Sequence, residues 1–240
     1  MMRSFKKLWA ALEALVYPRR AVCMGCGTAV GCEEDWICPA CRLTLAENWI
    51  GAGRPPKGLR AAAYAYFYSG AAAGIVQRMK YDGVYRLVPF MGEAMARASR
   101  FIEPMAADCV TSVPMHEKRL RERGFDHAGL LAEDVAGRLS LPYEALLMRT
   151  RDTPQQARLD DADRRRNLKG AIEAKGSVAG RRILLVDDVC TTGATAGACA
   201  KALYRAGAQS VYLLCYAMAR PKGRRGQGSG RPDDRDRAHK

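Results

Sequence analysis

The sequence of 240 residues lacks several features, and each absence excludes a class of protein. No stretch approaches the ~20 uncharged apolar residues that a helix needs to cross a bilayer, which excludes a membrane span. The phosphate-binding pattern G-x4-G-K-[ST] is missing, so the chain is not a P-loop nucleotide hydrolase. Histidine is scarce, and no arrangement of His116, His127 and His239 supports Cys190 as a catalytic nucleophile.

The N-terminal segment also lacks the features of a secretory signal. It starts with positive charge and apolar residues, but Glu13 interrupts the apolar part and residues 17–20 form a poor cleavage site. The apolar residues instead have helical spacing, which predicts an amphipathic helix within residues 1–20. Its stripe comprises Phe5, Leu8, Trp9, Leu12, Leu15 and Val16. We therefore expect a cytoplasmic protein whose cysteines are reduced thiols rather than disulfides.

Acidic residues are outnumbered, because 39 lysines and arginines oppose 25 aspartates and glutamates for a net charge of +14. Such an excess favours polyanionic partners, either nucleic acid or phosphorylated small molecules. Part of it lies in residues 220–240, a Gly-, Arg- and Pro-rich segment that we expect to be a disordered basic tail. Residues 222–240 contain no aromatic side chain, which argues against single-strand recognition by base stacking there.

Cysteine, in contrast, is abundant between residues 23 and 41. Two C-x2-C pairs, Cys23 with Cys26 and Cys38 with Cys41, are separated by eleven residues. Each pair can direct two sulfurs at one ion, and four thiolates in a tetrahedron suit zinc. Residues 21–50 are therefore interpreted as a module with a structural zinc ion, since four protein ligands leave no open position. An iron–sulfur cluster and four buried apolar cysteines are the alternatives, and Cys32 is interpreted as a loop thiol.

The rest of the chain alternates between strand and helix patterns. Strands are predicted at 61–68, 109–113, 145–148, 183–188 and 210–217, and helices at 71–81, 87–101, 129–139 and 193–206. Strands that alternate with helices of this length favour βαβ units, so we expect an α/β fold with a parallel sheet flanked by helices. Residues 50–57 are rich in Gly and Pro and are predicted to be a linker, which places this main domain at residues 58–219.

The most informative segment is ILLVDDVCTTGAT, at residues 183–195. An apolar strand leads to Asp187 and Asp188, then to a Thr/Gly loop and a helix, and ligands of open α/β folds bind at this end of the strands. The loop and the helix N-terminus can hold a phosphate, whereas the acids suit hydroxyls or a divalent ion. An acidic strand of a nucleotide hydrolase, or a simple helix cap, explains less of this run. A sugar-phosphate site is therefore predicted, with a loop that comprises Thr191, Thr192, Gly193, Ala194 and Thr195.

This segment resembles the phosphoribosyl-pyrophosphate motif of type I phosphoribosyltransferases. The whole chain is more specifically similar to the ComF family of competence proteins (ComFC-like, also called amidophosphoribosyltransferase-like). Members of that family have an N-terminal apolar helix, a four-cysteine zinc module and a transferase-like domain. Further matches within residues 5–219 are Val113-Pro114-Met115-His116, Arg119, Arg123-Gly124-Phe125, T-P-x-Q-x2-L at 153–159 and R-N-x2-G-A at 166–171.

The resemblance implies a type I phosphoribosyltransferase-like domain that binds phosphoribosyl pyrophosphate with Mg²⁺. In that family the paired acids, here Asp187 and Asp188, hold the ribose hydroxyls, and the Thr/Gly loop cradles the 5′-phosphate. The basic segment after the strand at 109–113 corresponds to the pyrophosphate site, which points to Arg119 and Arg123, with Lys118 as a third candidate. The resemblance further implies transfer of the phosphoribosyl group to a nitrogenous acceptor and an association with DNA uptake.

One departure from the family concerns the sequence RGFNQ, which here reads RGF followed by Asp126 and His127. His127 is a candidate proton carrier, but a loop contact or helix-start residue is the simpler interpretation, and His116 is interpreted as a turn residue. The alternative to an enzyme is a non-catalytic zinc-containing adaptor or nucleic-acid-binding accessory protein in DNA uptake. Pyrophosphate release with candidate bases, against salt-dependent DNA retention without turnover, separates the two.

Overall fold

The structure is a computed structural model that describes residues 21–30, 36–102, 106–151 and 170–220. The expectations for the amphipathic helix, for Cys32 and for the basic tail after Arg220 lie outside these ranges. Among the described residues, no helix is both long enough and apolar enough to cross a membrane.

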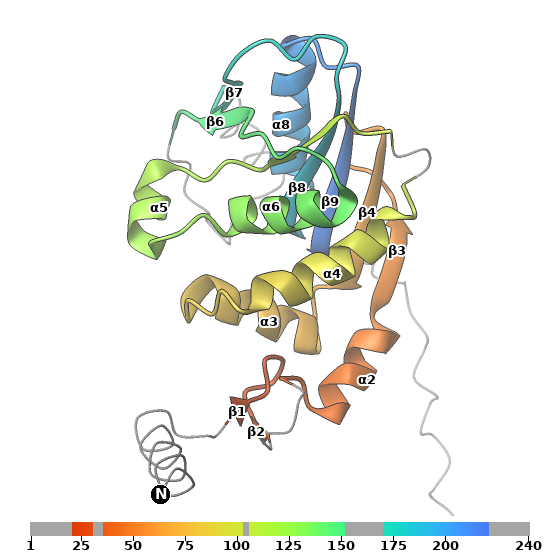
Figure 1. The fold of residues 1–240 in the computed structure, drawn as a ribbon, viewed down its shortest axis with the longest axis vertical. Coiled ribbons are helices and arrows are strands. Elements are labelled where there is room, and N and C mark those ends of the chain that lie inside the picture. Colours follow the sequence, from red (N-terminus) through yellow and green to blue (C-terminus); the bar gives the residue numbers. More distant parts are fainter. Residues whose placement is uncertain (1–20, 31–35, 103–105, 152–169, 221–240) are drawn as a thin grey trace, which may run out of the picture.

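A five-stranded sheet forms the centre of the molecule, in the order β3-β4-β9-β8-β5 (Figure 1). Its strands are β3 (Trp49–Gly53), β4 (Ala61–Phe67), β5 (Cys109–Ser112), β8 (Arg182–Cys190) and β9 (Ser210–Met218). Four of them are parallel, and β3 pairs antiparallel with β4. The expected α/β class with a parallel sheet is thus confirmed, and β8 is a central strand buried on both faces.

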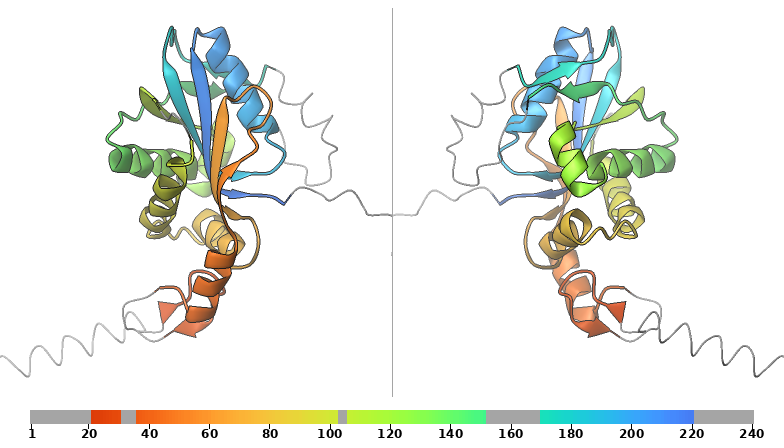
Figure 2. Two further views of the ribbon diagram at one scale, coloured as in Figure 1. Left: turned by 90° about the vertical axis from the view of Figure 1, so that its right-hand side faces the viewer. Right: turned by 90° about the vertical axis from the view of Figure 1, so that its left-hand side faces the viewer.

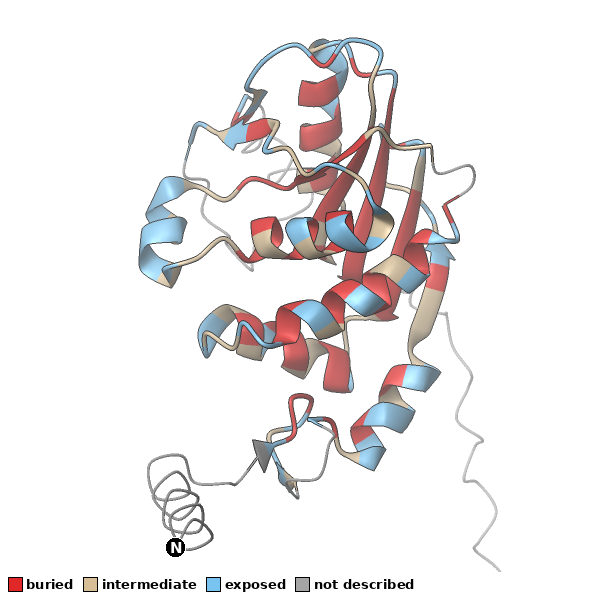
Figure 3. Cartoon of the chain, viewed as in Figure 1, coloured by how far each residue is buried: buried red, intermediate tan, exposed pale blue. Residues whose placement is uncertain are grey.

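Helices cover both faces of this sheet (Figure 2). The helix α8 (Ala194–Arg205) lies on one face, α4 (Leu87–Ser99) and α6 (His127–Leu139) lie on the other, and α3 (Gly70–Tyr81) lies at the lower end of the sheet in Figure 1. Side chains along β8 alternate between the two apolar clusters, with Ile183 and Leu185 toward α8 and Leu184 and Val186 toward α4 and α6. The buried sheet visible in Figure 3 therefore separates two cores.

The cysteine segment packs beside α3 rather than standing apart from the main core. It consists of the short strands β1 (Ala21–Val22) and β2 (Ala29–Val30), which pair antiparallel, and of helix α2 (Pro39–Glu47). Cys38 precedes α2, and Pro39 occupies its first turn, where a missing N–H costs nothing. Buried residues of this segment such as Met24 and Leu45 belong to the same apolar cluster as Ile75 and Met79 of α3.

Two sequence expectations about secondary structure were wrong in part. Residues 50–57 were predicted to be a linker, but their first half belongs to β3, because pairing with β4 stabilises the Gly-containing strand. The strand predicted at 145–148 is β6 (Leu147–Arg149), which lies outside the main sheet and pairs antiparallel with β7 (Ile172–Ala174). The basic segment after β5 forms a short helix, α5 (Glu117–Arg123), with no buried residue.

An ion pair at the start of β8 ties this strand to β5. Arg182 Nη2 lies 2.6 Å from Asp108 Oδ1, and the backbone N–H of Arg182 donates to Asp108 Oδ2 at 2.8 Å. The Arg182 side chain and then its backbone N–H lower the pKa of Asp108 from 3.8 to about 2. Because the pKa is lower in the folded state, the pair stabilises the fold above the ordinary pKa, and its contribution is lost as the pH falls toward 2.

Asp108→Asn is accordingly expected to lower the melting temperature at pH 6 and to leave it nearly equal to that of the unaltered protein near pH 2. Thermal unfolding of both proteins between pH 6 and pH 2 measures this convergence. A difference in melting temperature that is the same at every pH would contradict the assigned ion pair.

Candidate functional site

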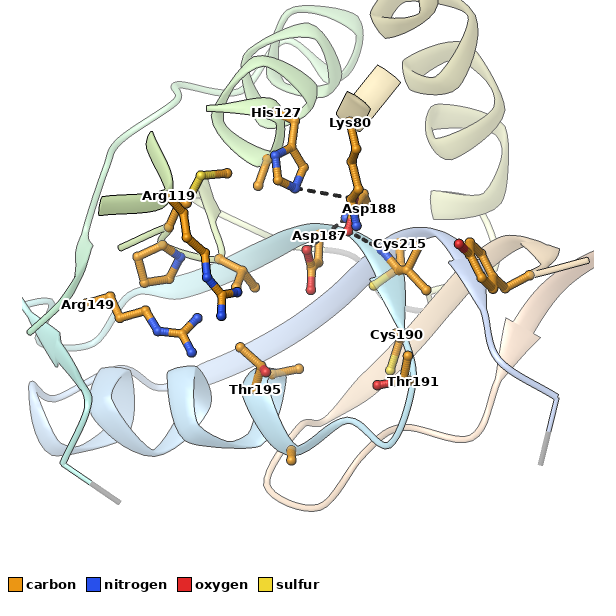
Figure 4. A pocket seen from close by; sticks show the side chains of 18 of the residues that line it. Lys80, Arg119, His127, Arg149, Asp187, Asp188, Cys190, Thr191, Thr195 and Cys215 are labelled. Atoms are coloured by element: carbon orange, nitrogen blue, oxygen red, sulfur yellow. Dashed lines mark hydrogen bonds and ion pairs between the residues drawn. The ribbon is translucent and has the colours of Figure 1, made fainter. Parts of the chain in front are cut away.

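The two acids of the predicted site lie within β8, which continues past them to Cys190. Adjacent residues of a strand point to opposite faces of the sheet. Figure 4 shows the Asp187 carboxylate pointing toward Thr195 and Asp188 lying beside Lys80 and His127. Each carboxylate also accepts a hydrogen bond from the next backbone N–H, at 2.9 Å for Asp187 and 2.7 Å for Asp188. The two carboxylates therefore lie in different surroundings.

Asp188 contacts two side chains from different helices. Lys80 Nζ, from the last turn of α3, lies 2.5 Å from Asp188 Oδ2, and His127 Nε2, at the start of α6, lies 3.3 Å from the same oxygen. Burial raises the pKa of Asp188, but the Lys80 ammonium and the His127 imidazole outweigh burial and hold that pKa well below its ordinary value. Asp188 is thus a carboxylate whose charge is already paired.

Asp187 is in the opposite situation. Burial and then the neighbouring charge of Asp188 raise the pKa of Asp187 well above its ordinary value, although Lys80 partly opposes this shift. A ligand hydroxyl or a cation at this carboxylate would favour its charged form. Asp187 is consequently the acid of the pair whose carboxylate can bind a ligand in the cavity.

The loop after β8 has the geometry of an anion site at a helix N-terminus. Gly193 precedes α8 with φ at +74°, a left-handed conformation that favours glycine, and a β-carbon there would run into the ring of Pro56. Thr192 Oγ1 accepts a hydrogen bond from the backbone N–H of Ala194 at 3.3 Å. The N-terminus of α8 carries the partial positive charge of its free N–H groups. This arrangement can hold a phosphate.

A cavity of about 310 Å³ joins these parts. Of the residues predicted for the site, those that line it are Asp187, Asp188, Thr191, Gly193, Ala194, Thr195, Arg119 and Arg123. Thr192 instead lines a neighbouring hollow over α8, and Lys118 does not line the cavity. The structure adds residues that the sequence analysis missed, among them Lys80, Tyr81 and Arg149.

The sequence carries one signal that points to Lys80. Ala72 and Val76 of α3 are buried, and Lys80 follows at the same four-residue spacing, so it belongs on the buried face of the helix. A lysine at such a position needs a partner of opposite charge. The identity of that partner, Asp188, depends on the packing of α3 against β8.

Arg123 connects the basic helix α5 to the acid pair. Its Nη1 lies 3.3 Å from His127 Nδ1, and its guanidinium stacks on the ring of Tyr81 at 5.5 Å. Because an arginine N–H donates, His127 Nδ1 is the acceptor and Nε2 carries the proton toward Asp188. The two residues Asp126 and His127 thus have different roles. His127 contacts Asp188, whereas Asp126 Oδ1 caps α6 by accepting a hydrogen bond from the N–H of Gly129 at 3.1 Å.

His116 has the turn position expected for it. It caps α5, with Nδ1 accepting a hydrogen bond from the backbone N–H of Lys118 at 3.2 Å. The residue therefore fixes the start of the helix that carries Arg119 and Arg123.

The four predicted cysteine ligands converge at the other end of the molecule. The Sγ atoms of Cys23, Cys26, Cys38 and Cys41 all lie within 4.8 Å of one another, and Cys26 Sγ is 3.8 Å from Cys38 Sγ. Tetrahedral thiolates around zinc at the usual bond length are separated by roughly 3.8 Å. Backbone N–H groups of Gly25 and Cys38 point at Cys23 Sγ, at 3.4 and 3.2 Å.

The surroundings of Cys23 favour the form of a thiol that binds a metal. Burial raises the pKa of the Cys23 thiol, but hydrogen bonds from the backbone of Cys26, Cys38 and Gly25 lower it to about 6. A thiolate is the form that coordinates a metal ion. The four cysteines can therefore hold a metal such as zinc.

Comparisons with known proteins agree with the expected type of domain. Residues 127–236 match the family model described as phosphoribosyl transferase domain. DNA utilization protein YhgH of Escherichia coli K12 is 28% identical over 216 residues, which cover 86% of this chain and 94% of that protein. Competence protein ComFC of Bacillus subtilis is 27% identical over 209 residues, which cover 83% and 84% of the two chains. The crystal structure of adenine phosphoribosyltransferase from Rhodothermus marinus aligns with a TM-score of 0.40 and 16% identity, over 75% of this chain and 86% of that chain.

The fold and the cavity at the end of β8 define a protein with a phosphoribosyltransferase-type domain. The similarity of the chain to DNA utilization protein YhgH and to Competence protein ComFC, together with the matching family model, supports its resemblance to the ComF family.

Proposed function

We propose that the protein binds phosphoribosyl pyrophosphate in the cavity at the end of β8 and transfers its phosphoribosyl group. The domain responsible would comprise residues 58–219, after a metal module at residues 21–50. The observation that carries the proposal is that one cavity brings together an acid, an anion-binding loop and two arginines, namely Asp187, the loop around Gly193, Arg119 and Arg123. A sugar that carries phosphate at one end and pyrophosphate at the other matches this set of groups.

Each end of the ligand has a counterpart in the cavity. The 5′-phosphate would be held by the N-terminus of α8 and by the hydroxyls of Thr191 and Thr195, which line the cavity. The carboxylate of Asp187 would accept hydrogen bonds from the ribose hydroxyls. Arg119 and Arg123 would bind the pyrophosphate, for which planar guanidinium groups are well suited.

The proposed reaction displaces pyrophosphate at ribose C1 by a nitrogenous nucleophile. The bond between C1 and the pyrophosphate oxygen breaks with its electron pair on that oxygen, while the nitrogen lone pair forms the bond to C1 and the nitrogen loses a proton. Arg119 and Arg123 stabilise the charge that develops on the leaving group, and the loop and Asp187 hold the sugar in place. Oxygen ligands such as Asp187 could help to hold Mg²⁺, which would supply further charge neutralisation at the phosphates.

Calorimetric titration of the full chain with phosphoribosyl pyrophosphate, with and without Mg²⁺, tests the proposal. We expect saturable binding that is stronger with Mg²⁺. Arg123→Gln should weaken this binding roughly ten- to a hundredfold, because a hydrogen bond to a charged group contributes about 1.5–3 kcal/mol.

Arg121→Gln is the matched control for the loss of one positive charge on the same helix. Its side chain is 73% exposed and pairs with Glu117 at 3.6 Å, away from the cavity. We expect it to keep the affinity of the unaltered protein. Equal losses in both variants would assign the effect to overall charge and would contradict the pyrophosphate site, and absence of binding to the unaltered protein would contradict the proposed function.

The metal of the N-terminal module is proposed to be a structural zinc ion. The site has four thiolate donors, which match the preference of zinc and fill its four positions. Elemental analysis should find one zinc per chain, whereas iron with acid-labile sulfide would assign an iron–sulfur cluster instead.

A second candidate function has an observation of its own. Between α2 and α4 the structure assembles an aromatic and basic groove in which Arg86 stacks on Trp36 at 5.5 Å and Arg97 stacks on Trp49 at 4.8 Å. Aromatic faces beside arginines can stack with unpaired bases, so an accessory protein that binds single-stranded nucleic acid is the alternative. DNA retention that falls steeply with salt, without pyrophosphate release, would favour it over the transferase.

A further inference from the structure

Helix α3 contacts both the cysteine segment and the acid pair of β8. Its last turn delivers Lys80 to Asp188, and its first turns lie against the segment that carries Cys23 and Cys26. In Figure 1, α3 lies between the cysteine module and the end of β8. Twelve residues of helix span roughly 18 Å, so one rigid element extends from one site to the other.

Lys80 and Asp188 form a pair that is nearly removed from solvent. The side chain of Lys80 is 16% exposed and that of Asp188 is 5% exposed. Burial lowers the pKa of Lys80, but the charge of Asp188 raises it further, so the ammonium form is retained. Separating such a pair leaves buried charge without compensation, which is far more costly than losing a surface ion pair. The position of Lys80 therefore determines the charge and orientation of Asp188.

At its other end, α3 touches the cysteine segment backbone to backbone. A β-carbon at Gly74 would overlap the carbonyl oxygen of Gly25, and one at Gly25 would meet Ala71 Cβ at 3.0 Å. Gly27, which follows Cys26, lies against the guanidinium group of Arg78. The contact positions 71, 74 and 78 lie along one face of the helix. A movement of this segment cannot be absorbed by flexible side chains, because none lies between Gly25 and Gly74.

We propose that α3 couples the four-cysteine module to the cavity at the end of β8, with Lys80 as the positioning residue that transmits the state of the module to Asp188. When the cysteines hold their metal, the segment around Gly25 fixes α3, and α3 holds Lys80 at Asp188. When this packing is disturbed, Lys80 withdraws and Asp188 loses its main counter-charge. The effect on ligand affinity rests on the proposed function, whereas the effect on Lys80 does not.

The test compares Gly74→Ala with the unaltered full chain, both loaded with zinc. Gly137→Ala is the matched control, because Gly137 lies in α6 and a β-carbon there has no neighbour within 4 Å. The first readout is acetylation of Lys80 by an N-hydroxysuccinimide ester, measured by mass spectrometry relative to the exposed Lys201. The second is the affinity for phosphoribosyl pyrophosphate, and zinc content and the melting temperature are followed in parallel.

We expect Gly74→Ala to keep its zinc and to be acetylated faster at Lys80 than the unaltered protein. We also expect it to bind phosphoribosyl pyrophosphate about tenfold more weakly, as is typical of coupled sites. Gly137→Ala should match the unaltered protein in all readouts. Lys80→Met should weaken ligand binding while zinc is retained, and Lys80→Arg should restore part of the affinity. Recovery by arginine would not follow from a role in packing alone, since methionine fills the same space.

Two results would overturn the coupling. One is an unchanged rate of Lys80 acetylation in Gly74→Ala, and the other is protection of Lys80 that persists after a chelator removes zinc from the unaltered protein. Should Gly74→Ala not fold, Ala71→Val disturbs the same face of α3 at another position and is judged by the same acetylation rate. If Lys80 responds but no protein binds phosphoribosyl pyrophosphate, the coupling stands and the proposed function fails.

Discussion

Cys38→Ser is expected to abolish zinc binding and to unfold the segment around residues 21–47. Zinc sites of four thiolates contribute about 10–16 kcal/mol of apparent binding free energy in small modules, and this energy is available to the fold only when all ligands are present. Cys38 contributes one of the four Sγ atoms, and it also precedes the first residue of α2. Elemental analysis and circular dichroism of the purified variant would measure the loss.

Cys32→Ser is the matched control for this expectation, because it removes a thiol from the same segment without removing a proposed ligand. We expect this variant to retain one zinc per chain and the melting temperature of the unaltered protein. Loss of zinc from Cys32→Ser would place Cys32 in the ligand set, and retention of zinc by Cys38→Ser would exclude the proposed tetrahedral site.

Asp187→Asn is expected to weaken the binding of phosphoribosyl pyrophosphate roughly ten- to a hundredfold while the fold stays intact. The amide keeps the shape of the side chain, but it replaces a charged acceptor with a neutral group, and hydrogen bonds to charged groups contribute about 1.5–3 kcal/mol. Calorimetric titration measures the affinity, and thermal unfolding measures the fold. Since burial raises the pKa of Asp187, the fold itself gains little from its charge.

Asp188→Asn should behave differently from Asp187→Asn. It leaves the Lys80 ammonium buried beside a neutral amide, and breaking one partner of a buried pair costs about 3–5 kcal/mol of stability. We therefore expect a lower melting temperature for Asp188→Asn, with weaker ligand binding as a consequence. Equal melting temperatures for the two variants would contradict the assignment of Asp188 to Lys80 and His127, and unaltered affinity in the double variant would exclude the acids from the site.

The sequence was sufficient to predict the segment from β8 to α8. Its apolar strand, acids, Thr/Gly loop and helix are contiguous, so local pattern and local structure coincide. The same holds for the two cysteine pairs, whose spacing alone indicates convergence on one ion. The resemblance to a known family assigned the pair Asp187 and Asp188 a common role, whereas the alternation of a strand places their side chains on opposite faces.

The parts that the sequence did not predict depend on contacts between distant segments. Lys80 reaches Asp188 only because α3 packs under the end of β8. The segment of strand β3 was predicted to be a linker because of its glycines, and it forms a strand because it pairs with β4. The aromatic groove draws Trp36, Trp49 and Arg97 from three separate segments of the chain, so no basic stretch of the sequence reveals it. Local composition does not contain such information.

The position of β9 has a consequence for how the chain can be synthesised. Among the described residues this strand comes last in the sequence, yet it lies between β4 and β8 and pairs in parallel with both. Until the ribosome has made Ser210–Met218, the described strands of the central sheet can form only two separate pairs, β3 with β4 and β5 with β8. Each pair then presents an unpaired apolar edge, which is a template for association with other chains. Translation that stops before Ser210 would therefore yield aggregating fragments rather than a shortened but functional protein.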